Sequence, residues 1–174
     1  MGRIMTVDRI SGSILQTQYS PAETLKLVAL PDAVAPARAY CAATLRGWGF
    51  MDPDFLFDAE LVVSELVTNA LEVVSLGDRP RRLLEEGALI RLTLTVLADL
   101  LFIEVWDRVL RPPRPQCDVP ADATRGRGLR IVADLACQWG YRYSEGPCGP
   151  DGKTVYAVLP VPAHPIQASK YLDV

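Results

Sequence analysis

Apolar and polar positions over residues 60–74 repeat with the period of an α-helix, and no Gly or Pro interrupts them. Asn69 lies at helical spacing from Leu66 and Val73, so it falls on the apolar side of this helix. Glu65 lies one turn earlier, at the border of that side. A buried amide or carboxylate is costly unless something pairs with it. The partner could be structural. It could also be a ligand, with Asn69 giving an oxygen to Mg²⁺ and Glu65 holding or deprotonating a water.

Alternation of apolar and polar residues predicts five strands. They span Thr24–Leu30, Ala88–Leu97, Leu100–Trp106, Trp139–Ser144 and Thr154–Leu159. A turn at Ala98-Asp99 joins the second and third strands into a hairpin, and a Gly/Pro turn over Gly146–Gly152 joins the last two. The period of two leaves one face of the hairpin buried and the other tolerant of polar residues, as in an antiparallel sheet that is covered on one side.

Two further helices are expected at Ala33–Arg46, with Asp32 as its cap, and at Leu129–Gln138. Asp52 or Asp54 caps the central helix. Because runs of strands are separated by helices without strict alternation, the sequence predicts an α+β fold. Its architecture is a two-layer sandwich, in which a mixed, mainly antiparallel sheet carries helices on one face.

The chain of 174 residues predicts one domain over residues 21–160, between a loose N-terminal arm (1–20) and a C-terminal tail (161–174). Residues 75–87 are polar and charged, which is typical of a solvated connection. Residues 107–125 contain four prolines and have no periodicity. A stretch of this kind inside a compact domain is usually a functional lid or a disordered segment.

Composition excludes several classes of function. The net charge of −3 gives no electrostatic case for nucleic-acid binding. The longest apolar stretch, residues 92–109, is interrupted by three acidic residues, so no membrane span is expected. The first residues have no continuous apolar signal region, and the sequence therefore predicts a cytoplasmic protein.

Cysteine and histidine chemistry finds no support either. The four cysteines lack the spacing of a zinc site, and isolated buried thiols are the expected interpretation. The single histidine, His164, lies in a proline-flanked tail and is a poor candidate for a general base, so a Ser-His-Asp or Cys-His arrangement is not indicated.

Two other segments could share a ligand with the central helix. Asp107 directly follows an apolar strand; it could be a turn residue, or it could accept a hydrogen bond from an exocyclic amine. Gly126-Arg127-Gly128 precedes a predicted helix. It could be a hinge, or its glycines and the helix start could approach a phosphate, which Arg125 and Arg127 could also reach.

A third segment, Gly152-Lys153-Thr154, invites comparison with a P-loop. The spacing from Gly146 is one residue too long, and a strand follows instead of a helix, so we reject a P-loop. A turn before the last strand is the simpler interpretation, although the Thr154 hydroxyl could still contact a ligand.

Taken together, four motifs identify a resemblance. The segments SELVTNA, VWD followed by prolines, GRGL-x-IV and GKTVY occur in this order between about Thr24 and Leu159. They resemble the conserved boxes of the GHKL ATPase superfamily, and within it the small stand-alone anti-sigma factor serine kinases are most similar.

This resemblance implies a Bergerat fold that binds ATP and Mg²⁺ between helices, sheet and lid. Glu65 would be the general base or would orient a water, and Asn69 would be the Mg²⁺ ligand. Asp107 would bind the adenine amino group, and Thr154 would support the adenine end. The phosphates would be bound by the segment at the start of the next helix. Its residues are Arg125, Gly126, Arg127, Gly128 and Leu129.

Three hypotheses follow. The first is a serine/threonine protein kinase that transfers the γ-phosphate of Mg-ATP to an anti-anti-sigma partner, sequesters a sigma factor, or does both. The second is a non-catalytic module of the same fold, motivated by Val109, because the family usually has Gly or Ser at this position. The third is a plain α+β domain whose polar helix residues pair with each other. By analogy with the family alone, a homodimer is also an option.

Overall fold

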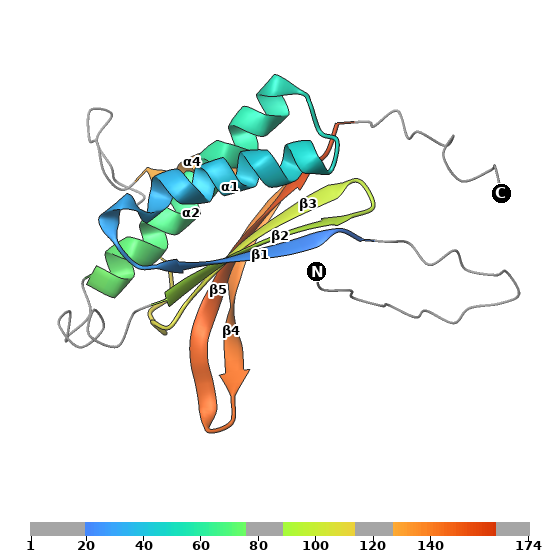
Figure 1. Ribbon diagram of the computed structural model, residues 1–174. Coiled ribbons are helices and arrows are strands. Elements are labelled where there is room, and N and C mark those ends of the chain that lie inside the picture. Colours follow the sequence, from blue (N-terminus) through green and yellow to red (C-terminus); the bar gives the residue numbers. More distant parts are fainter. Residues whose placement is uncertain (1–19, 76–88, 114–126, 163–174) are drawn as a thin grey trace, which may run out of the picture.

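Five antiparallel strands form one sheet, in the spatial order β1-β2-β3-β5-β4 (Figure 1). The computed structural model describes residues 20–75, 89–113 and 127–162. The strands are β1 (Ala22–Val28), β2 (Leu89–Leu97), β3 (Leu100–Asp107), β4 (Gln138–Gly146) and β5 (Gly149–Pro160). The helices are α1 (Val34–Gly47), α2 (Pro53–Ser75) and α4 (Gly128–Leu135), and a short 3₁₀ turn, Pro31–Ala33, precedes α1.

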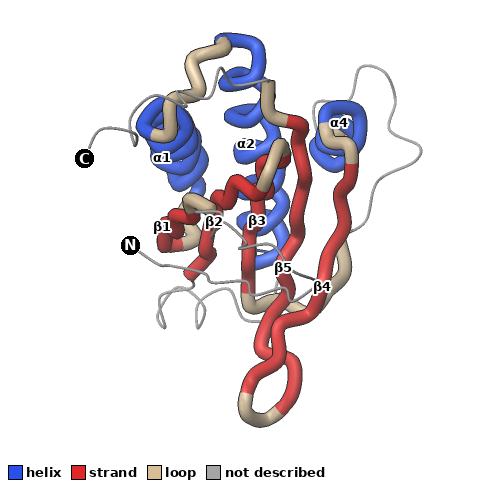
Figure 2. The backbone as a smooth tube through the Cα atoms, turned by 90° about the vertical axis from the view of Figure 1, so that its right-hand side faces the viewer, coloured by secondary structure: helices blue, strands red, loops and turns tan. Residues whose placement is uncertain are grey.

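The three helices lie on the same face of the sheet, as Figures 1 and 2 show from two directions. The predicted fold class is therefore confirmed. The sheet is not mixed in the part of the chain that the structure describes, because each described pairing is antiparallel. No described helix is long and apolar enough to cross a membrane.

The core lies between the helices and the middle of the sheet. In β3, Leu101, Ile103, Val105 and Asp107 are buried, while the alternate residues are only partly covered. This alternation is expected when one face of a sheet packs against helices and the other faces solvent. The inward side chains of β3 meet the apolar side of α2, and the inward residues of β2 and β5 extend the same layer.

The predicted N-terminal cap is confirmed for α2 and wrong for α1. The backbone N–H of Phe55 donates to Asp52 Oδ1 at 2.8 Å, so Asp52 caps α2 and Asp54 lies inside its first turn. The predicted Asp32 cap is wrong. Asp32 lies within the 3₁₀ turn, and no side chain caps either that turn or α1.

Two boundaries differ from the prediction because β4 and β5 are longer than expected. Helix α4 ends at Leu135 and not at Gln138, since the N–H of Cys137 already donates to Val158 O at 2.9 Å and Gln138 pairs in the sheet. The turn predicted over Gly146–Gly152 shrinks to two residues, because β5 starts at Gly149. In Figure 2, this hairpin extends well beyond the layer of helices.

Several sequence predictions lie outside the described residues. They concern residues 1–19 of the arm, most of the polar connection over residues 75–87, residues 114–125 of the lid, and the tail from residue 163.

The β2–β3 turn yields a first prediction. Ala98 has φ 54°, in the left-handed region that costs a non-glycine residue free energy. We therefore expect Ala98→Gly to raise the free energy of unfolding by about 1 kcal/mol in urea titration. Asp99→Gly is the matched control, since Asp99 is not in that region. Equal or greater stabilisation by Asp99→Gly would contradict this interpretation of the turn.

Candidate functional site

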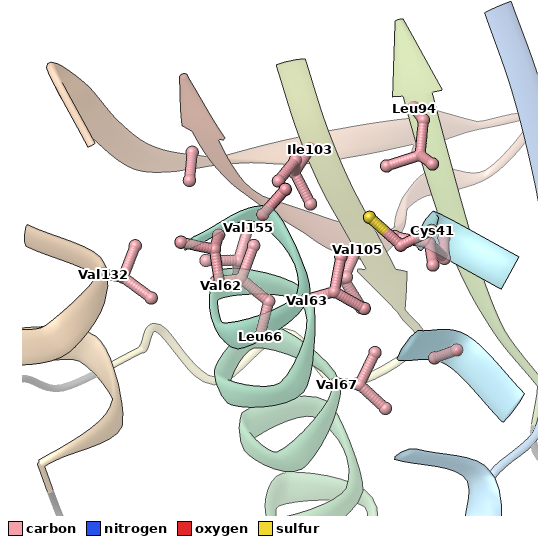
Figure 3. Packing of buried hydrophobic residues seen from close by; sticks show 14 of the residues in the cluster. Cys41, Val62, Val63, Leu66, Val67, Leu94, Ile103, Val105, Val132 and Val155 are labelled. Atoms are coloured by element: carbon pink, nitrogen blue, oxygen red, sulfur yellow. The ribbon is translucent and has the colours of Figure 1, made fainter. Parts of the chain in front are cut away.

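Packing of α2 against the sheet positions the two polar residues of the central helix. Figure 3 shows the buried side of α2, with Val62, Val63, Leu66 and Val67 pointing into the core and Val132 of α4 beside them. Glu65 and Asn69 are half-buried and lie at the border of this apolar side. A helix places residues four apart on the same face, so both side chains lie along one edge of α2.

Glu65 lies directly against the start of α4. A methyl group built on Gly128 would lie 2.5 Å from Glu65 Oε2, closer than a real Cβ atom approaches another atom. Gly128 therefore allows the first turn of α4 to approach the carboxylate of α2. The first N–H groups of a helix are free to bind an anion, so this contact brings a proton acceptor and a potential phosphate site together.

Asn69 has a polar group without a partner. Among the described residues, its Nδ2 atom is buried and has no hydrogen-bond partner. Ser64 on the same helix differs, since its hydroxyl donates to Glu60 O at 2.8 Å. An unsatisfied buried amide is costly and uncommon in folded proteins, and this group is therefore a candidate for a ligand contact.

The pKa of Glu65 is raised in the folded chain. Burial is the main cause, because it disfavours the charged carboxylate, and the negative charge of Glu72 adds to it. A carboxylate with a raised pKa is a better proton acceptor from a hydroxyl or a water than an ordinary one.

A magnesium ion at this edge of α2 would need water and phosphate oxygens to complete its coordination. In the described ranges, no group of three or more His, Cys, Asp or Glu side chains is placed to hold a metal. Mg²⁺ commonly takes one or two protein oxygens and completes its coordination with water and phosphate. The amide of Asn69 fits this role, because a half-turn of the amide exchanges its nitrogen and oxygen.

Asp107, at the end of β3, forms a buried ion pair with Lys153 of β5. The Lys153 ammonium lies 2.7 Å from Asp107 Oδ1 and 2.6 Å from Oδ2, and both side chains are completely buried. Lys153 Nζ also donates to Val109 O at 2.9 Å, and the N–H of Val109 donates to Asp107 Oδ1 at 2.8 Å. The register of the sheet brings the pair together, since Asp107 and Lys153 face each other across β3 and β5.

Burial and mutual attraction act in opposite directions on this pair. Burial raises the pKa of Asp107 and lowers the pKa of Lys153, since it disfavours both charged forms. The hydrogen bonds and charge of each partner oppose these shifts. A buried pair of this geometry is therefore sensitive to the loss of either member.

Thr154 does not join Asp107. It pairs with Trp106, and adjacent residues of a strand point to opposite faces, so Thr154 lies on the face away from the helices. Gly152, two residues before Thr154, permits the end of β3 to lie close to β5. A Cβ atom on Gly152 would lie 2.5 Å from Asp107 O and 2.6 Å from Trp106 Nε1. The GKT segment thus lies in a strand, which agrees with the rejection of a P-loop.

Of the other residues expected to bind the phosphates, only some lie in the described part of the chain. Arg125 and Gly126 lie outside the described residues. Arg127 is exposed and precedes the first residue of α4, whereas Leu129 is buried in the core.

Lys153 is the residue that sequence reasoning missed. A lysine at the start of an apolar strand resembles an ordinary turn residue, and only the pairing of β3 with β5 reveals its partner.

A family model described as a histidine kinase-like ATPase domain matches residues 27–159, more than half of the chain. This range contains the Glu65–Gly128 contact, Asn69 and the Asp107–Lys153 pair. Comparison with curated proteins finds no match.

The buried ion pair yields a second prediction. We expect Asp107→Leu and Lys153→Met each to lower the free energy of unfolding by about 3–5 kcal/mol, because each leaves an unpaired buried charge. The double variant should lose clearly less than the sum, as measured by urea unfolding. As a control, Arg142→Met removes the exposed ion pair with Glu104 and should cost at most about 1 kcal/mol. Additive losses in the Asp107 and Lys153 variants would contradict the coupling.

The raised pKa of Glu65 yields a third prediction. The folded state holds the proton of Glu65 more tightly than the unfolded state, so its favourable contribution is present at low pH and is lost as pH rises through the raised pKa. We expect Glu65→Gln to unfold at a higher temperature than the wild type at neutral pH, with the difference vanishing towards about pH 4. Asp58→Asn, on the same helix, is the control. A difference that is independent of pH would rule out this cause.

Proposed function

The chain belongs to the family of histidine kinase-like ATPase domains, and from this premise we propose that it is a regulatory protein kinase. Membership of this family implies that the domain binds ATP. Beyond binding ATP, the protein transfers the γ-phosphate of Mg-ATP to a serine or threonine of a protein partner, sequesters a sigma factor, or does both.

The observation that supports this proposal best is the unpartnered Nδ2 atom of Asn69, one helical turn from a carboxylate that lies against Gly128. A purely structural Asn would be expected to pair with its neighbours. Here a buried polar atom, a proton acceptor and the N-terminus of α4 belong to two helices that pack together. Phosphoryl transfer needs a metal ligand, a base and a phosphate site in this kind of proximity.

Each residue has a distinct task in the proposed reaction. Glu65 accepts the proton of the attacking hydroxyl, while the hydroxyl oxygen forms a bond to the γ-phosphorus and the bond from that phosphorus to the bridging oxygen of ADP breaks. Gly128 leaves room for the Glu65 carboxylate beside the start of α4, whose free N–H groups would bind phosphate oxygens. Asn69 would hold Mg²⁺, which neutralises the charge of the phosphates when it is bound. Glu65 then releases its proton to solvent.

The partner class comes from the motifs and not from a surface of the domain. The four motifs resemble those of anti-sigma factor serine kinases, whose partners are anti-anti-sigma factors and sigma factors. On the same basis we propose a cytoplasmic location and retain a homodimer as an option.

One observation favours the alternative of a non-catalytic binding module. Asp107, the residue that would bind the adenine amino group, already accepts hydrogen bonds from Lys153 and from the backbone N–H of Val109. The backbone of Val109 contacts both members of the pair, since its carbonyl accepts from Lys153 and its N–H donates to Asp107. In a binding module, affinity for the protein partner would be unchanged by ATP and by Glu65→Ala. Loss of partner binding after either change would count against it.

The fourth prediction separates binding from chemistry. By titration calorimetry, the wild type should bind ATP in the presence of Mg²⁺, and Asn69→Ala should abolish the dependence of this binding on Mg²⁺. Glu65→Gln should keep its ATP affinity within a few-fold. It should slow phosphate release from ATP by about 100-fold, with water in place of the partner hydroxyl, because a general base contributes at least this factor.

Asp58→Asn serves as the matched control, since it also removes a half-buried carboxylate from α2. It should leave both binding and phosphate release unchanged. A wild-type protein that does not bind ATP would refute the proposed function.

A further inference from the structure

The hydrogen bonds of the Asp107–Lys153 pair are almost completely used within the chain. An ammonium group has three N–H donors, and those of Lys153 have three acceptors, namely Asp107 Oδ1, Asp107 Oδ2 and Val109 O. Asp107 Oδ1 accepts from both Lys153 and Val109, which fills its two lone pairs. Only one acceptor position, on Oδ2, remains for any other donor.

A free carboxylate differs in both capacity and charge. It offers about four acceptor positions and carries a full negative charge, so an amine that donates to it makes a strong, charge-assisted hydrogen bond. At Asp107 the charge is already balanced by an ammonium at 2.6 Å, and the carboxylate is fully buried. An incoming amino group would meet a neutralised acceptor that is shielded by its own chain.

Lys153 is held in this position by more than its charge. It lies within β5, directly opposite Asp107, and it is completely buried. Its third bond, to Val109 O, fixes the backbone that follows β3. Moving the ammonium away would break three hydrogen bonds and leave the Asp107 carboxylate unpaired, which a single weak donor from a base cannot offset.

We infer that Lys153 is a specificity-determining residue that relaxes selection of the nucleotide base, so that this domain binds purine nucleoside triphosphates mainly by their phosphates and discriminates poorly for the 6-amino group. The inference rests on the proposed function, since it concerns the base end of the same site. Its chemical consequence is that a purine nucleotide without an exocyclic amine binds about as well as ATP.

The fifth prediction compares ATP with purine riboside triphosphate, which lacks only the 6-amino group. By titration calorimetry with Mg²⁺, we expect the wild type to bind both with dissociation constants within about fivefold. A charge-assisted hydrogen bond to a free carboxylate would favour ATP by about tenfold or more. Lys153→Thr, which frees Asp107, should bring the preference for ATP to that level. ATP should then raise the unfolding temperature of this variant more than the analogue does.

Two controls isolate the base end. Lys26→Thr makes the same change on the exposed part of β1 and should leave the selectivity as in the wild type. Asn69→Ala, at the phosphate end, should weaken both nucleotides by the same factor. If Lys153→Thr does not fold, the wild-type ratio decides alone.

The outcomes separate this inference from the proposed function. A wild-type preference for ATP of about tenfold or more would overturn the inference and leave the nucleotide site intact. Unchanged selectivity in a folded Lys153→Thr variant would overturn it as well. A wild type that binds neither nucleotide would refute the proposed function, and the inference with it.

Discussion

The contact between the apolar side of α2 and the inward residues of β3 and β5 determines where the polar residues of the helix lie. It buries Val62, Val63 and Leu66 completely, and it fixes the rotation of the helix about its own axis. Because side chains of a helix are locked to that rotation, Glu65 and Asn69 are held along one edge of α2, where Glu65 meets Gly128 of α4. Their position is a consequence of core packing and needs no other support.

The polar residues on α2 and those at the end of β3 have different surroundings. At the edge of α2, the Glu65 carboxylate lies against Gly128, and the Nδ2 atom of Asn69 has no hydrogen-bond partner in the described part of the chain. At the end of β3, polar groups are satisfied by each other, because Asp107 faces Lys153 in the sheet. A domain built in this way would bind phosphates more firmly than a particular base.

The sequence predicted the arrangement of elements well because their signals are local. The period of α2, its Asp52 cap and the alternation of β3 each depend on a few neighbouring residues, and all are present in the structure. The end of α4 at Leu135 was missed, because pairing of Gln138 in β4 competes with the helix and cannot be seen locally.

The site was only partly predictable for the same reason. The Glu65 and Asn69 pair can be found from helical spacing alone, whereas the contact of Glu65 with Gly128 is seen only in the structure. A ligand shared by these residues stays a prediction. The roles of Asp107 and Thr154 depend on register between strands that are distant in sequence. That register turns Thr154 to the other face and brings Lys153 to Asp107, and no spacing within either segment indicates it.

On the proposed function, the phosphates of ATP bind beside the start of α4 while Asp107 stays paired with Lys153 at the end of β3. A crystal structure with Mg²⁺ and a non-hydrolysable ATP analogue is the decisive experiment. We expect phosphate oxygens beside Gly128 and the metal ion on Asn69, with the Lys153 ammonium still bound to Asp107. An ammonium displaced from Asp107 by the adenine amino group, or phosphates bound away from Gly128 and Asn69, would show that the nucleotide binds differently.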